Sequence, residues 1–231
     1  MGKRLALVVC GILFAVVFSF FVGKAEADIF DTNDYIFADQ GNYWPWGDAR
    51  NLRYQLWFSN DMLSDEGFSG KLTSISHFIA YDSKAASYDF DVYASNTAVE
   101  ALTTDFDANH GSDKTLIFSG NAALPGSGSQ FLINVNPVFI YNGKSNLLID
   151  YVFKRFYGIG NDYGGPTWEA VNPNSDFLRV TSHADEGDVV YDWGALRTQL
   201  NATPVPEPIS STLFLLGAGA LGLRKFRRKK A

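Results

Sequence analysis

Apolar and polar residues alternate with a period of two through much of this 231-residue chain. Residues 88–94 are the clearest case, because every second residue there is aromatic or aliphatic and the residues between them are two aspartates and a tyrosine. Residues 131–135 repeat the pattern. Successive side chains of a strand point to opposite faces, so this period predicts half-buried strands. No long segment of residues 28–203 has the 3.6-residue period of an amphipathic helix, and the chain is therefore predicted to be all-β.

Further strands and the turns between them follow from the same pattern. Residues 146–153 are almost continuously apolar, which is typical of a central strand. Asn142-Gly143 follows residues 138–141 and suits a positive-φ turn, so a β-hairpin is predicted there. Other β-rich runs occupy residues 54–58, 72–81, 115–119 and 176–181. Together they predict a single antiparallel β-sandwich of jelly-roll type over residues 28–203.

The amino-terminal end has the features of a signal peptide. A short basic stretch precedes an apolar run over residues 5–22, and Ala25 and Ala27 then provide the small residues that a signal peptidase accepts. These features predict a signal peptide at residues 1–27 and a mature chain that begins at Asp28. The apolar run is close to the length of a membrane span, so an uncleaved anchor is the alternative.

The carboxyl-terminal end, residues 204–231, combines three features in a fixed order. Pro206, Glu207 and Pro208 form a rigid, extended motif, because each proline fixes φ and removes a backbone donor. A short apolar transmembrane helix is predicted at about residues 209–223. Six cations that would stay on the cytoplasmic side of the inner membrane follow it: Arg224, Lys225, Arg227, Arg228, Lys229 and Lys230. The body would then lie on the far side of that membrane.

This order of motif, helix and basic tail resembles the PEP-CTERM sorting signal of Gram-negative bacteria. The resemblance implies that an exosortase, a membrane cysteine transpeptidase-like enzyme, recognises Pro206, Glu207 and Pro208 and processes the tail. It also implies a membrane-anchored intermediate that ends at the cell surface or outside the cell. Hosts of this system commonly secrete exopolysaccharide, which the resemblance implies as a partner. An ordinary tail anchor is the alternative.

The body has a second resemblance, which concerns its fold. Arg53-Tyr54-Gln55, residues 72–75, residues 118–120 and residues 139–150 resemble segments of secreted bacterial jelly-roll domains. Such domains often accompany adhesins or sugar-binding proteins. The matching residues are strand and turn residues, so they indicate architecture and carry little information on activity.

Charge and cysteine content exclude several functions of the body. Residues 28–205 contain ten basic and 23 acidic residues, a formal charge of −13. Such a body repels phosphate groups, so no nucleic-acid partner is expected. Cys10 is the only cysteine of the chain and lies within the predicted signal peptide. The mature body therefore has neither a disulfide nor a cysteine nucleophile.

One acidic segment has the composition of a calcium loop. Asp105, Asp107, Asn109 and Asp113 place oxygen atoms at alternate positions around Gly111, and such oxygens are the ligands that calcium prefers. The glycine stands one position later than in an EF-hand and no glutamate closes the loop, so the segment is not an EF-hand. A polar turn, in which Asp and Asn bond the local backbone, is the alternative.

Several aromatic residues stand among turn residues, where they would be exposed: Trp44, Trp46, Tyr157, Tyr163 and Trp168. Flat rings of this kind stack on the C–H faces of sugars while nearby Asn and Asp bind hydroxyls, so they are candidates for carbohydrate stacking. The alternative is that they close the open ends of the sandwich, because large aromatic side chains are mostly buried.

The sequence favours a protein without enzymatic activity. It has no G-x-S-x-G motif, and its three histidines are too scattered to predict a zinc site. The prediction is therefore an exported cell-surface or matrix protein that binds exopolysaccharide or mediates adhesion. The alternative is an exported hydrolase of polysaccharide or another envelope polymer, in which two carboxylates from distant strands would meet.

Overall fold

The computed structural model describes residues 27–32, 38–42, 53–81, 86–124, 129–158, 167–171, 177–183, 187–191 and 195–205. Ala27–Val205 form a compact unit of their own. Ala25, the Pro206-Glu207-Pro208 motif, the helix predicted at 209–223 and the basic tail lie outside the described residues. Within the ranges given above, no helix is long and apolar enough to cross a membrane.

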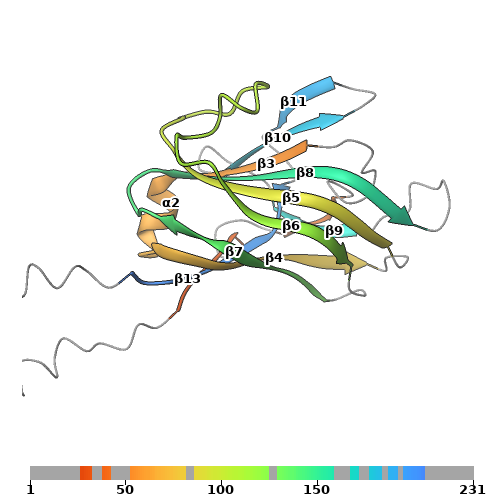
Figure 1. Cartoon of the computed structure of the whole chain (residues 1–231), viewed down its shortest axis with the longest axis horizontal. Helices are drawn as coiled ribbons and strands as arrows, with labels where there is room; N and C mark the ends of the chain where they lie inside the picture. Colours follow the sequence, from red (N-terminus) through yellow and green to blue (C-terminus); the bar gives the residue numbers. More distant parts are fainter. Residues whose placement is uncertain are drawn as a thin grey trace, which may run out of the picture. The chain divides into compact units, whose positions relative to one another are not determined.

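Two antiparallel sheets build this unit (Figure 1). The seven-stranded sheet has the order β1 (Asp28–Asp31), β13 (Thr198–Thr203), β4 (Gly70–Tyr81), β9 (Thr167–Val171) and β12 (Ala195–Leu196), with β7 (Gln130–Tyr141) paired to β4 and β2 (Ala38–Asn42) paired to β9. The six-stranded sheet has the order β11 (Gly187–Tyr191), β10 (Phe177–His183), β3 (Arg53–Phe58), β8 (Asn146–Gly158), β5 (Ala86–Thr97) and β6 (Thr115–Ala123). The predicted all-β sandwich is confirmed.

A short helix, α2 (Asn60–Asp65), follows β3. Its N-cap is Ser59, whose Oγ accepts a hydrogen bond from the backbone N–H of Met62 at 3.1 Å. This contact satisfies one of the free donors of the first turn. The buried side chains of Met62 and Leu63 then join the core, so the helix closes one region of the sandwich interior.

The period-two pattern of the sequence places the core between the sheets. On β5, the side chains at positions 88, 90, 92 and 94 are at most 1% exposed, as the alternation predicts. On β7, Phe131 and Ile133 are buried, whereas Leu132 between them is exposed. Aromatic rings from both sheets meet in this layer, for example Phe90 of β5 and Phe131 of β7, whose centroids are 6.3 Å apart.

The continuous apolar run of β8 reflects burial on both faces of the six-stranded sheet. β8 lies between β3 and β5, so the prediction of a central strand is confirmed. One face packs on the main core, and the other is covered by residues 98–114, which join β5 to β6 and lie outside the sheet in Figure 1. A second apolar cluster forms under this loop from Trp57, Leu102, Phe106, Leu148 and Val180.

The hairpin predicted around Asn142-Gly143 is wrong, although the turn itself forms. Asn142 Oδ1 accepts from the backbone N–H groups of Lys144 and Ser145 at 2.8 and 2.9 Å, and Gly143 has a φ of 64°. However, β7 pairs with β4, whereas β8 pairs with β3 and β5. The turn therefore passes the chain from one sheet to the other. Turn residues determine the local reversal, but burial of each strand's apolar face determines its partner.

A buried histidine connects the two sheets. His77 of β4 is fully buried, and its Nε2 lies 2.7 Å from the hydroxyl of Tyr151 of β8. Its Nδ1 lies 3.2 Å from the carbonyl oxygen of Arg197. Because a carbonyl only accepts, the neutral ring donates from Nδ1 and accepts the Tyr151 proton at Nε2. Burial lowers the pKa of His77 to about 3, so the ring stays neutral in the native state at neutral pH.

We expect this histidine to make stability depend on pH in mild acid. The unfolded chain binds a proton at His77 below pH about 6.5, while the native state does so only near 3. The stabilisation is thus complete above pH 6.5 and is lost as pH falls, by up to about 1.4 kcal/mol per pH unit. Urea unfolding between pH 6.5 and 4.5 should show a shallower slope for His77→Gln, and an unchanged slope would contradict this assignment.

Candidate functional site

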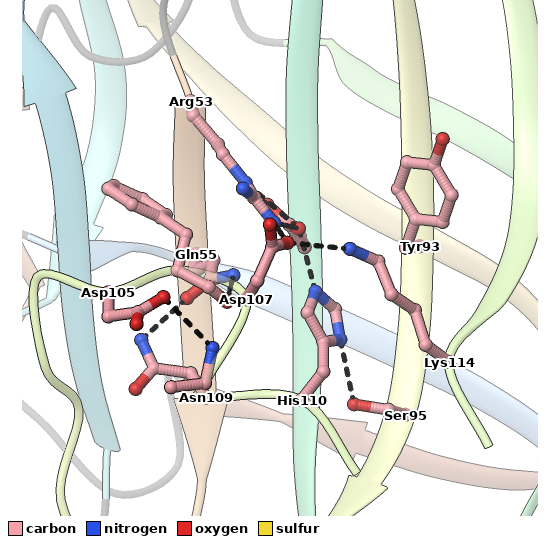
Figure 2. Close-up of polar contacts among 12 residues, drawn as sticks. Arg53, Gln55, Tyr93, Ser95, Asp105, Asp107, Asn109, His110 and Lys114 are labelled. Atoms are coloured by element: carbon pink, nitrogen blue, oxygen red, sulfur yellow. Dashed lines mark hydrogen bonds and ion pairs between the residues drawn. The ribbon is translucent and has the colours of Figure 1, made fainter. Parts of the chain in front are cut away.

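A network of charged and amide side chains lies on the outer face of the six-stranded sheet, beneath residues 98–114 (Figure 2). We call it the Asp150 network, and it includes two of the predicted calcium ligands, Asp107 and Asn109. Strands β3, β5 and β8 supply its base, and the loop supplies the rest. Its members are Arg53, Gln55, Ser95, Asp107, Asn109, His110, Lys114 and Asp150.

Asp150 is the centre of this network, and its side chain is fully buried. Its carboxylate accepts hydrogen bonds from Arg53 Nη2 at 2.6 Å, from Arg53 Nε at 3.1 Å and from His110 Nε2 at 2.8 Å. Burial by itself would raise the pKa of the Asp150 carboxyl, but the hydrogen bonds from His110 and Arg53 outweigh burial and lower that pKa below its usual value. The buried carboxylate is therefore charged and fully engaged at neutral pH.

Arg53 connects the buried centre to the solvent-exposed part of the loop. Its Nη2 also donates to Asp107 at 2.8 Å, and Lys114 Nζ lies 3.1 Å from the same oxygen. The hydrogen bonds from Arg53 and Lys114 lower the pKa of Asp107 to about 2. The two cations also lie over aromatic rings: Arg53 is 5.0 Å from the centroid of Phe106, and Lys114 is 4.9 Å from that of Tyr93.

Two buried amides attach the loop to β3. Asn109 Nδ2 donates to Gln55 Oε1 at 2.9 Å and to the carbonyl of Thr103 at 2.8 Å. Gln55 Nε2 in turn donates to the carbonyl of Phe106 at 2.9 Å. Asn109 is 1% exposed and Gln55 is fully buried, so these bonds form away from water. Their partners would otherwise be buried polar groups without hydrogen bonds, which is costly.

The four predicted calcium ligands point to different protein partners. Asp105 Oδ1 accepts from the N–H of Ala108 at 3.1 Å, Asp107 pairs with two cations, and Asn109 bonds Gln55. Asp113 accepts from the backbone and the side-chain amide of Asn96 at 3.0 and 2.6 Å. In the described part of the chain, no group of three or more His, Cys, Asp or Glu side chains is arranged to hold a metal ion. These contacts correspond to the polar-turn alternative, and calcium binding stays a prediction.

Gly111 has a role that the sequence did not indicate. A Cβ atom at this position would collide with the carbonyl oxygen of Asn96 on β5. The glycine therefore permits the close approach of the loop to the strand. Its position seventh in the acidic segment follows from this packing, independently of any ion.

A hydrogen-bonded chain of serine, histidine and aspartate also occurs here, and sequence reasoning missed it. Ser95 Oγ lies 3.0 Å from His110 Nδ1, and His110 Nε2 donates to Asp150. The three residues stand on two strands and a loop with no motif around them, so only the tertiary structure brings them together. Ser95 is fully buried and its Oγ accepts from the N–H of Gly111 at 3.3 Å. An incoming substrate cannot reach this hydroxyl. The hydrogen bonds among Ser95, His110 and Asp150 instead hold the loop in place.

Of the five aromatic candidates, one is buried and the side chains of the other four lie outside the described residues. Trp168 of β9 is fully buried, with its ring edge-on to His77 and Phe131 at centroid distances of 6.3 and 5.8 Å. A buried indole cannot stack on an external sugar, so the stacking prediction is wrong for Trp168, which fills the core instead. The side chain of Tyr157 in β8, and Trp44, Trp46 and Tyr163, lie outside the described residues.

The described unit is thus a single β-sandwich with an acidic surface and a closed polar network. The segment that follows it identifies the class of protein: residues 204–229 match the PEP-CTERM protein-sorting motif. The identification made from the C-terminal residues is confirmed, and this motif implies an exported protein that an exosortase sorts.

Other comparisons add little. No curated protein matches this chain. Two solved structures, of the Gt and Gx strains of infectious bursal disease virus, are each 13% identical, with TM-scores of 0.27 and 0.25. Each match covers 79% of this chain, which spans only 38% and 43% of the viral chains. Similarity at this level carries no argument about fold or function.

The two carboxylates that share Arg53 make a matched pair for testing the network. Asp150 is fully buried, whereas the side chain of Asp107 is 76% exposed. Asp150→Asn removes the buried anion that Arg53 and His110 share and should lower the free energy of unfolding by about 3 kcal/mol. Asp107→Asn should cost less than about 1 kcal/mol, because water screens that pair. Urea unfolding at pH 7 measures both, and equal losses would show that Asp150 does not anchor the loop.

Proposed function

We propose that this chain is a non-enzymatic surface or matrix protein whose β-sandwich associates with exopolysaccharide after exosortase sorting. The observation that carries this proposal is the position of the sorting motif. The last strand, β13, ends at Thr203, and the match to the motif begins at residue 204. The sandwich is thus the cargo that the sorting signal delivers, and its surface is what meets the extracellular polymer.

The Asp150 network supports a role without catalysis. Its serine hydroxyl is buried, and its central carboxylate is held by Arg53 as well as by His110. The exposed carboxylate, Asp107, forms ion pairs with Arg53 and Lys114. A glycoside hydrolase needs one carboxyl that is free to protonate the leaving group and a second that is free to act as base or nucleophile. The carboxylates of the network are instead paired with cations.

The alternative, an exported hydrolase of polysaccharide, predicts a different result in a simple assay. We expect the purified full-length protein to retain polysaccharide from its host's exopolysaccharide without releasing reducing ends. Ser95→Ala should leave this binding unchanged, because the buried hydroxyl does not contact the polymer. Release of reducing sugar that disappears when a carboxylate pair is replaced would overturn the non-enzymatic proposal.

Processing at the sorting motif gives a test of delivery. We expect Glu207→Ala, or replacement of both Pro206 and Pro208 by alanine, to leave the tail attached and the protein in the inner membrane. The physical reason is that the two prolines keep the segment extended and accessible, while Glu207 places one charge between them. Pro204→Ala, which lies outside the Pro206-Glu207-Pro208 triplet, is the matched control and should be processed normally.

The readout is the intact mass and the membrane fraction of the protein, in cells with and without the exosortase. Loss of the basic tail should reduce membrane retention and leave recognition of the motif intact. Normal processing and release of the Glu207→Ala variant would show that the segment acts as a simple tail anchor.

A further inference from the structure

The outer face of the seven-stranded sheet has a centre of uncharged polar side chains. The register places Gln199 of β13 opposite Ser76 of β4, and places Asn201 opposite Ser74 and Ser74 opposite Asn134 of β7. In Figure 1, β13, β4 and β7 form the layer opposite β3, β8 and β5. We call this surface the neutral face, and its central members are Ser74, Gln130, Asn134, Gln199 and Asn201.

These side chains are held in place by one another. Gln130 Nε2 donates to Gln199 Oε1 at 2.9 Å, and Asn201 Nδ2 donates to Ser74 Oγ at 3.0 Å. Each amide keeps further donors and acceptors for an external partner. The centre of the face therefore has ordered hydrogen-bonding groups with capacity left over.

Exposed aliphatic side chains lie beside and among these polar groups. Ile29 of β1 is 59% exposed, and Leu132, Val138 and Ile140 of β7 are 50, 53 and 49% exposed. A protein–protein interface normally has an apolar centre and a polar rim, whereas here Leu132 lies between Gln130 and Asn134 on β7. Packing a second protein on this face would bury the amides at its centre, which costs free energy wherever they are left unpaired.

The neutral face also differs from the rest of the body in charge. The body carries a formal charge of −13, yet the carboxylate at an outward position of β1, Asp31, is neutralised by Arg197 at 2.8 Å. Lys71 of β4 is a cation at the edge of the face, opposite Ile140. A polyanionic ligand would be repelled by the body as a whole, whereas an uncharged one would not.

From this arrangement we infer that the neutral face binds an uncharged polysaccharide chain lying along the strands. The amides and the Ser74 hydroxyl exchange hydrogen bonds with the sugar hydroxyls, and the exposed aliphatic side chains contact the C–H faces of the rings. This inference rests on the proposed function and specifies the surface and the charge class of the polymer.

The test adds charge to the face without changing shape. The double variant Gln199→Glu/Asn134→Asp is isosteric, and the new carboxylate at 199 still accepts from Gln130. The matched control, Asn60→Asp/Asn142→Asp, adds two charges at α2 and at the β7–β8 turn, where both side-chain oxygens already act as acceptors.

The probes are the host's exopolysaccharide, separated by anion exchange into neutral and acidic fractions. Affinity electrophoresis of the full-length proteins measures retardation, and thermal unfolding checks that both variants are folded.

We expect the unmodified protein and the control to bind the neutral fraction, at least tenfold more tightly than the acidic one. Gln199→Glu/Asn134→Asp should bind the neutral fraction at least tenfold more weakly than either. Unchanged binding by this variant would overturn the assignment of the face while leaving the proposed function intact. If the unmodified protein bound the acidic fraction more tightly than the neutral one, the inference that the polymer is uncharged would be overturned. Absence of binding to both fractions would overturn the carbohydrate role and this inference together, and a change of sedimentation in the variant would indicate a second copy as the occupant.

Discussion

The buried carboxylate of Asp150 is the interaction on which the arrangement of the six-stranded sheet depends. A lone charge at that position would be too costly, so Arg53 from β3 and His110 from the loop must both reach it. This requirement folds residues 98–114 onto the outer face of the sheet. The second apolar cluster then forms beneath the loop, and β8 becomes buried on both faces.

The sandwich consequently has two unlike outer faces. On the outer face of the six-stranded sheet the loop covers the Asp150 network, in which Ser95, His110 and Asp150 form a closed hydrogen-bonded chain. The seven-stranded sheet presents amides, hydroxyls and aliphatic side chains to solvent. An exported protein needs a stable body and, if it is to bind a partner, an accessible surface. In this protein the covered face of the six-stranded sheet contributes to stability, and the outer face of the seven-stranded sheet is the accessible surface.

Much of the fold could be predicted, because strand periodicity is a local property. The alternation in β5, the central place of β8 and the all-β class follow from which residues are apolar and how they are spaced. The hairpin at Asn142-Gly143 failed for a physical reason: turn chemistry is local, whereas strand pairing depends on distant partners. The candidate site was harder still, because Asp105, Asp107, Asn109 and Asp113 have the composition of an ion site but bond to Ala108, Arg53, Gln55 and Asn96.

The sequence by itself determined the destination and the class of fold. The sorting motif is contiguous, so its order of proline motif, apolar segment and cations can be read without any structure. Only the tertiary structure decided which polar residues are used inside the protein and which remain available outside it. Arg53 and Asp150 are 97 positions apart, and Gln130 and Gln199 are 69 apart. Hydrogen bonds over such separations depend on strand pairing and layer packing, which bring together residues whose spacing along the chain carries no periodic signal.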